Sequence, residues 1–175
     1  MEMLGNSSWR WGLSLIVLTM TIHSAALLIM AFVGTRIRVQ LETRRRRQWS
    51  LIALQICATA LIGLLLAVLH GIECGIWAAA YLWVGALDSP TDALLYSVDS
   101  MATLGASGLT LRRPWQVMGG LEAVNGMILF GVSTAYVFAV MQLYWSMLAK
   151  YVTLAMAEAL RGNASLRSPP KRSEH

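Results

Sequence analysis

The chain has 175 residues, of which 57% are apolar and only 13% are charged, with a formal net charge of +5. A soluble domain of this length needs more charge to cover its surface, so the composition excludes an ordinary soluble fold and predicts that apolar residues face lipid. The positive charge does not indicate a nucleic-acid surface, because six of the fourteen basic residues lie between Arg36 and Arg47 and five lie from Lys150 onward. Basic residues gathered at the ends of apolar runs indicate membrane topology instead.

The first apolar run, 12–34, has no charged residue and predicts a transmembrane helix within an N-terminal segment of residues 1–35. A run of this length crosses a hydrocarbon core of about 30 Å at a rise of about 1.5 Å per residue. It is longer than the apolar part of a signal peptide and lacks a clear cleavage site, so we expect it to be retained. The basic segment 36–48 is short and adjoins two spans, so we expect it to be cytoplasmic.

The second apolar run begins at Trp49 and extends to Leu87, nearly twice the length that one crossing needs. It predicts an outer helix over 49–87. From His70 onward the run contains more polar and aromatic residues, so we expect the helix to leave the membrane there, with a bend at Gly71 or Gly75.

The third run predicts an inner helix over 117–148, an amphipathic cytoplasmic extension over 149–162 and a disordered tail over 163–175. Counting spans from the basic loop places the N-terminus outside and the C-terminus in the cytoplasm, and the basic residues of the tail agree. Arg112 and Arg113 fall on the outer side and disagree. Eleven basic residues outweigh these two.

Residues 88–114 lie between the second and third spans. The run Ser89-Pro90-Thr91-Asp92 predicts a helix start, with the serine as N-cap and the proline at the first helical position. The predicted helix 90–103 is too short to cross a bilayer and ends before the glycine-rich run Gly105–Gly108. Two arrangements fit this pattern: a re-entrant pore loop, or an extracellular loop with one interfacial helix.

Several groups of residues follow one another in a recognisable order: Ala93 to Val98, Thr103-Leu104-Gly105, Trp115, Leu121 to Gly126, and Phe130-Gly131. This order and spacing, over about residues 70–142, resembles the pore module of small bacterial potassium-channel-like proteins, and the extra N-terminal span suits their three-span subgroup. The resemblance implies an all-α membrane protein with three transmembrane helices plus a re-entrant pore helix and filter loop, assembled as a homotetramer. The pore module would cover 49–148.

The resemblance implies a selectivity filter made of six residues, Thr103, Leu104, Gly105, Ala106, Ser107 and Gly108. The first three match the family pattern T-[VL]-G-Y-G-D, and the last three replace its tyrosine, second glycine and aspartate. In the family, four such strands direct backbone carbonyls at dehydrated potassium ions. Ala106 cannot brace the strand as the tyrosine does, and a left-handed backbone would be costly for Ser107. We therefore expect the outer ion sites to be missing or wide and the inner ones to remain compatible with ion binding.

Asp99 lies one helical turn before Thr103, where some potassium channels have a carboxylate that shares hydrogen bonds with the filter aspartate. Gly108 stands at the position of that aspartate, so the carboxylate needs a new partner or a proton. The Ser107 hydroxyl and the filter N–H groups are the candidate partners. Two roles stay open for Asp99: support of the filter, or a solvated carboxylate in a wide vestibule.

Four more positions follow from the resemblance. Arg112 and Arg113 would add eight positive charges around the outer mouth of a tetramer and lower the local cation concentration; contact with lipid head groups explains them equally well. Gly126 matches the hinge glycine of the inner helix, and Gly131 is a second flexible point. Both glycines also suit close helix packing.

Polar residues inside the predicted spans are functional candidates by default. Glu122 and Asn125 share a face of the third span, and Glu122 also suits a structural contact between subunits. His70 and Glu73 are i,i+3 neighbours that can pair, either as structural anchors or in a proton relay. Cysteines, histidines and carboxylates do not occur at the spacings of known metal sites. The sequence therefore predicts no cofactor and no metal beyond transient monovalent ions.

The predicted function is passive ion conduction through a potassium-channel-like homotetramer of a bacterial inner membrane, weakly selective because the filter has GASG in place of GYGD. Its predicted partners are copies of itself, the lipid bilayer and monovalent ions, K⁺ included, without nucleic acid. The alternative is a non-conducting subunit or scaffold that acts through the 149–162 helix. An enzyme is not predicted, because no nucleophile–base–acid set is present. The segment after Leu148 is too short for a ligand-sensing domain.

Overall fold

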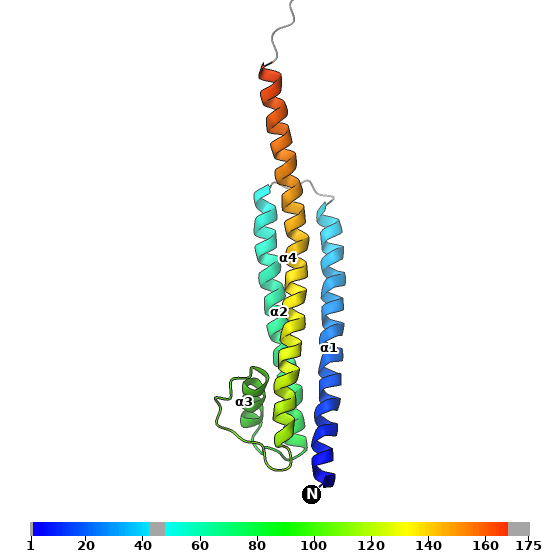
Figure 1. The fold of residues 1–175 in the computed structure, drawn as a ribbon, viewed down its shortest axis with the longest axis vertical. Coiled ribbons are helices and arrows are strands. Elements are labelled where there is room, and N and C mark those ends of the chain that lie inside the picture. Colours follow the sequence, from blue (N-terminus) through cyan, green and yellow to red (C-terminus); the bar gives the residue numbers. More distant parts are fainter. Residues whose placement is uncertain (1, 43–47, 168–175) are drawn as a thin grey trace, which may run out of the picture.

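The computed structural model describes residues 2–42 and 48–167, and every regular element within them is a helix (Figure 1). The helices are α1 (Glu2–Glu42), α2 (Gln48–Trp83), α3 (Pro90–Met101) and α4 (Gln116–Arg167). Three segments are long and apolar enough to span a membrane: Ser7–Ile37, Gln55–Trp83 and Gln116–Gln142. The predictions of an all-helical fold and three apolar spans are therefore confirmed.

The three long helices lie side by side, with α2 antiparallel to α1 and α4 (Figure 1). The start of α1 and the short helix α3 lie at one end of the bundle. The end of α1 and the start of α2 lie at the other end of the bundle, and α4 continues well past both of them. The C-terminal part of α4 is thus at the same end of the bundle as the end of α1 and the start of α2, as the counting of spans predicts.

The first two helices differ from their predicted limits. α1 continues to Glu42, and no glycine or proline interrupts it after Gly34. α2 ends at Trp83 rather than at residue 87, and it continues as one helix through the positions where a bend was expected.

A C-terminal cap explains why α2 ends early. Gly85 has a φ of 70°, a left-handed conformation that glycine adopts at little cost. Its N–H donates to the Leu82 carbonyl at 3.1 Å, and the Ala86 N–H donates to the Tyr81 carbonyl at 2.9 Å. This pair of bonds is a Schellman motif, which turns the chain out of the helix axis.

The last two helices also differ at their ends. α3 ends at Met101, two residues before the predicted limit. α4 is one helix through to Arg167, so the predicted inner helix and its extension are a single element and residues 163–167 are helical rather than disordered. The rest of the predicted tail, 168–175, lies outside the described residues.

The start of α3 agrees with the prediction. Ser89 has an extended backbone, with φ −99° and ψ 127°, and its hydroxyl accepts a hydrogen bond from the Asp92 N–H at 3.3 Å. Pro90 follows at the first helical position, where its missing N–H costs nothing. This cap fixes where the chain turns from the end of α2 into α3.

One stripe of α1 faces the rest of the bundle, and its buried residues are Ser8, Gly12, Leu15, Thr19, His23 and Leu27. A Cβ at Gly12 would lie 2.4 Å from Leu121 Cδ1, so the absence of a side chain lets α1 approach α4 closely. Asn125 of α4 donates to the Thr19 hydroxyl at 2.9 Å. Small and polar residues thus attach the N-terminal span to the other helices.

Candidate functional site

The C-terminal end of α3 lies deep between α2 and α4. Met101 Sδ is 3.5 Å from the Cys74 Sγ of α2, and the Met101 carbonyl lies against Gly126 of α4. Cys74 precedes the end of α2 by about 13 Å of helix, and Gly126 follows the start of α4 by about 15 Å. The end of the short helix therefore lies about a third of the way along each of the two apolar spans that flank it.

Residues after α3 return the chain to the end where it entered. The Arg112 N–H donates to the Ala86 carbonyl at 3.2 Å, so the chain closes beside the cap of α2 before α4 begins. Figure 1 shows α3 and this loop on the same side of the bundle. The segment 87–112 therefore leaves the end of α2 and returns to the start of α4 at the same end of the bundle.

The loop from Thr103 to Gly108 has an irregular backbone. Thr103, Gly105 and Gly108 have φ values of 57°, 65° and 68°. Glycine accepts this conformation readily, whereas for a threonine it costs about 1 kcal/mol or more. The cost expected at Ser107 does not arise, because the left-handed position falls on Gly108 instead.

Asp99 holds this loop through three hydrogen bonds. Its Oδ1 accepts from the Ala106 N–H at 2.9 Å, and its Oδ2 accepts from the Ser107 N–H at 3.1 Å and the Ser107 hydroxyl at 2.8 Å. The partners expected for this carboxylate, the serine hydroxyl and loop N–H groups, are thus confirmed. The Asp99 side chain is buried within the chain, at 8% exposure, which does not fit a freely solvated carboxylate.

These contacts set the protonation of Asp99. The Ala106 N–H and then the Ser107 hydroxyl lower the pKa of the carboxyl below its ordinary value. Because the folded-state pKa lies below the unfolded one, the bonds stabilise the loop above the ordinary aspartate pKa of about 3.9. They are lost as the pH falls through the lowered value.

Asp99→Asn is expected to loosen the loop, because an amide keeps one acceptor oxygen and its NH₂ group opposes the remaining donors. Hydrogen exchange of the Ala106 and Ser107 amides should accelerate by about tenfold or more. Exchange mass spectrometry on the purified chain measures this. Asp92→Asn at the start of α3 is the matched control and should leave the rate unchanged. Equal rates in the two variants would contradict the assignment.

The outer surface of the loop is open. Residues 103–106 are exposed, Leu104 at 69%, and so are Leu94, Leu95 and Val98 along α3. One side of the loop is thus fixed by Asp99, while the other side presents backbone and apolar side chains away from the chain.

The two arginines after the loop are not equivalent. Both guanidinium nitrogens at the end of Arg112 bond to the Asp88 carboxylate, with Nη1 to Oδ1 at 2.8 Å. The charge of Arg112 is therefore compensated by a residue that the sequence reasoning did not pair with it. Arg113 is exposed.

The two glycines of α4 also differ. A Cβ at Gly126 would lie 2.2 Å from the Met101 carbonyl oxygen, so the absence of a side chain here lets the backbones of α3 and α4 approach closely. No atom lies within 4 Å of the corresponding position at Gly131, which is part of the continuous helix.

Glu122 joins three helices inside one chain. Its Oε2 accepts from the Tyr81 hydroxyl of α2 at 2.5 Å, and its Oε1 accepts from the Ser97 hydroxyl of α3. The Ser97 hydroxyl also lies 2.9 Å from the Cys74 carbonyl. Glu122 is fully buried, so its polar contacts are within the chain and not with a second subunit.

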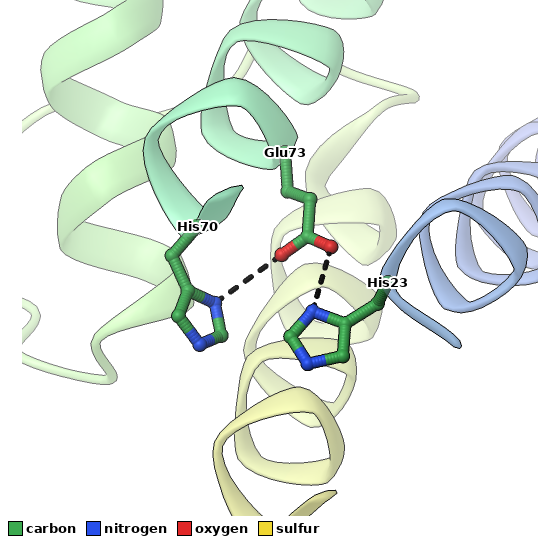
Figure 2. Close-up of side chains that lie close together, drawn as sticks. All are labelled: His23, His70 and Glu73. Carbon is green, nitrogen blue, oxygen red and sulfur yellow. Dashed lines mark hydrogen bonds and ion pairs between the residues drawn. The ribbon is translucent and has the colours of Figure 1, made fainter. Parts of the chain in front are cut away.

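A second polar group, the His–Glu cluster, consists of His23, His70, Glu73 and Ser133. His70 Nδ1 is 3.2 Å from Glu73 Oε2, which confirms the predicted pairing within α2. His23 of α1 reaches Glu73 Oε1 with Nδ1 at 2.9 Å (Figure 2). The Ser133 hydroxyl of α4 lies 3.0 Å from His23 Nε2 and 3.2 Å from His70 Nε2.

Sequence reasoning paired His70 with Glu73 but missed His23 and Ser133, because spacing along one segment cannot show a contact between α1, α2 and α4. The available signal was that His23, His70 and Ser133 each lie well inside an apolar span.

No protein-family model, curated protein or solved structure matches this chain. Its class follows from the structure alone: an all-helical protein with three apolar helices suited to multiple membrane crossings.

Proposed function

We propose that the protein is a potassium-channel-like ion channel in which four copies place the loop 103–108 around a central pore. The observation that supports this most is the course of α3 and its loop, which enters and leaves at one end of the bundle and reaches about a third of the length of the spans at Cys74 and Gly126. One chain supplies one such loop, so a closed ring needs several copies.

The exposed side of the loop supports an assembly. Irregular backbone at membrane depth persists only where protein or a water-filled cavity satisfies it. Residues 103–106 are exposed in the single chain, while Asp99 fixes the opposite side. In the proposed tetramer, neighbouring copies and hydrated ions surround this exposed side.

Weak selectivity follows from the same residues. The loop has alanine, serine and glycine at 106–108, and Asp99 bonds to backbone and serine where a filter aspartate would otherwise be its partner. Compensation of Arg112 by Asp88 lowers the positive charge expected near the loop. We place the protein in a bacterial inner membrane, with the N-terminus outside and the long end of α4 in the cytoplasm.

Restoring the family filter is the direct test. The triple variant Ala106→Tyr/Ser107→Gly/Gly108→Asp is expected to conduct K⁺ at least tenfold better than Na⁺, whereas the unchanged protein conducts both at similar rates. Planar-bilayer recordings and vesicle flux measure the ratio. Gly120→Ala, in an open position on α4, is the control and should behave as the unchanged protein. Absence of cation current from both proteins at every pH, voltage and tension would refute the proposal.

A second candidate, a non-conducting subunit or scaffold, is favoured by the C-terminal part of α4. This helix continues to Arg167, and its apolar side chains Val152, Leu154, Met156 and Leu160 are exposed. Crosslinking that stops below four copies, or co-purification with another channel subunit, would favour this candidate.

A further inference from the structure

We propose that His23, His70 and Glu73 bind a divalent transition-metal ion of the Zn²⁺ class, with Ser133 orienting both imidazoles. Nothing in the channel proposal requires this site. The metal would join the N-terminal span α1 to α2 beside α4.

The geometry of the cluster is close to that of a bound metal. Ligand atoms from the three residues lie within 4.8 Å of one another. A tetrahedral Zn²⁺ with bonds of about 2.0–2.2 Å separates its ligand atoms by about 3.4 Å. His23 Nδ1 and His70 Nδ1 lie 2.9 and 3.2 Å from the two Glu73 oxygens, so small side-chain movements suffice.

Ser133 can accept the hydrogen bonds of the tautomer that a metal needs. A hydroxyl oxygen has two lone pairs, and both Nε2 atoms lie within hydrogen-bonding distance of it. Figure 2 shows Nδ1 of each histidine directed at a Glu73 oxygen, so these nitrogens are the ones without a proton when both imidazoles donate Nε2–H to Ser133. In that tautomer the Nδ1 lone pairs repel the lone pairs of the Glu73 oxygens, and a cation bound between them removes this repulsion. A second partner on the outer nitrogen is also what orients metal-ligating histidines in general.

An unsatisfied buried atom points to the same place. Glu73 is fully buried, and its Oε2 has no aligned hydrogen bond although His70 Nδ1 lies near it. An unsatisfied carboxylate oxygen away from water is costly, and a metal bond would satisfy it.

The ligand set defines the class of metal. Two imidazole nitrogens and one carboxylate, with a fourth position for water, are typical of Zn²⁺ and related first-row ions. Mg²⁺ and Ca²⁺ prefer oxygen ligands throughout. The His70 side chain is 25% exposed, so one ligand remains reachable from outside the cluster.

Metal analysis of the purified full-length chain tests the proposal. After treatment with a chelator and addition of Zn²⁺, the unchanged protein should retain one ion per chain and reject Mg²⁺. Co²⁺ in its place should give the visible absorption of a tetrahedral nitrogen–oxygen site, a readout that needs no variant. Ser133→Ala should weaken Zn²⁺ binding by about 10- to 100-fold.

The ligand variants His70→Ala and Glu73→Gln should each lose stoichiometric Zn²⁺, while the control Asp92→Asn keeps it. Gel filtration and circular dichroism identify any variant that fails to fold, and the Co²⁺ spectrum of the unchanged protein remains decisive if one does. Absence of a stoichiometric ion from the unchanged protein would overturn the proposal. Undiminished binding in a folded His23→Ala/His70→Ala/Glu73→Gln variant would do the same.

Discussion

Replacing Glu122 with alanine is expected to detach α3 from α2 and α4 and to lower the free energy of unfolding by about 3 kcal/mol or more. The Tyr81 and Ser97 hydroxyls lose their shared acceptor, and each buried polar group left unsatisfied costs about 1–3 kcal/mol. Glu122→Gln keeps one acceptor oxygen and should cost less. Unfolding by a denaturing detergent in mixed micelles measures both changes.

Thr134→Ala is the matched control on the same helix. The Thr134 hydroxyl is exposed and bonds only to the Phe130 carbonyl of its own helix among the contacts described, so its loss should cost within about 0.5 kcal/mol. If Glu122→Ala and Thr134→Ala unfold at the same detergent fraction, the junction of three helices at Glu122 does not stabilise the fold.

Gly126→Ala is expected to be the second most damaging change. The added Cβ would lie 2.2 Å from the Met101 carbonyl oxygen and 2.9 Å from its carbonyl carbon, so two backbones must separate. Overpacking of this kind costs about 1–3 kcal/mol. Unfolding in mixed micelles gives the loss of stability, and hydrogen exchange in α3 shows where the structure loosens.

Two neighbouring glycines provide a graded comparison. A Cβ at Gly119 meets the Tyr96 hydroxyl at 2.1 Å, the end of a side chain that can turn away, whereas a Cβ at Gly120 meets no atom within 4 Å. Gly120→Ala should stabilise the helix by up to about 1 kcal/mol, and Gly119→Ala should fall between it and Gly126→Ala. A Gly126→Ala protein as stable as Gly120→Ala would show that the close approach of α3 and α4 is not required.

The sequence predicts features that depend on short stretches of chain. Hydropathy locates the spans, because burial of backbone in lipid demands long apolar helices. The Ser89 cap and the hydrogen bonds that Asp99 accepts from Ser107 are also predictable, since their partners lie within eight residues of each other.

Features that depend on packing between helices are not predictable in this way. His23 is fifty residues from Glu73, and their contact depends on the rotation of α1 about its own axis. Arg112 finds Asp88 only because the loop closes beside the cap of α2. The left-handed conformation at Thr103 likewise results from the whole loop, not from the preference of a threonine.

The unbroken course of α4 from Gln116 to Arg167 has a mechanical consequence. With no break in the helix, the part beyond Gly126 acts as a lever about 60 Å long. A tilt of about 5° at the contact with Met101 moves the Arg167 end by about 5 Å. A tilt of the whole helix therefore shifts the Arg167 end and the contact between Gly126 and Met101 together.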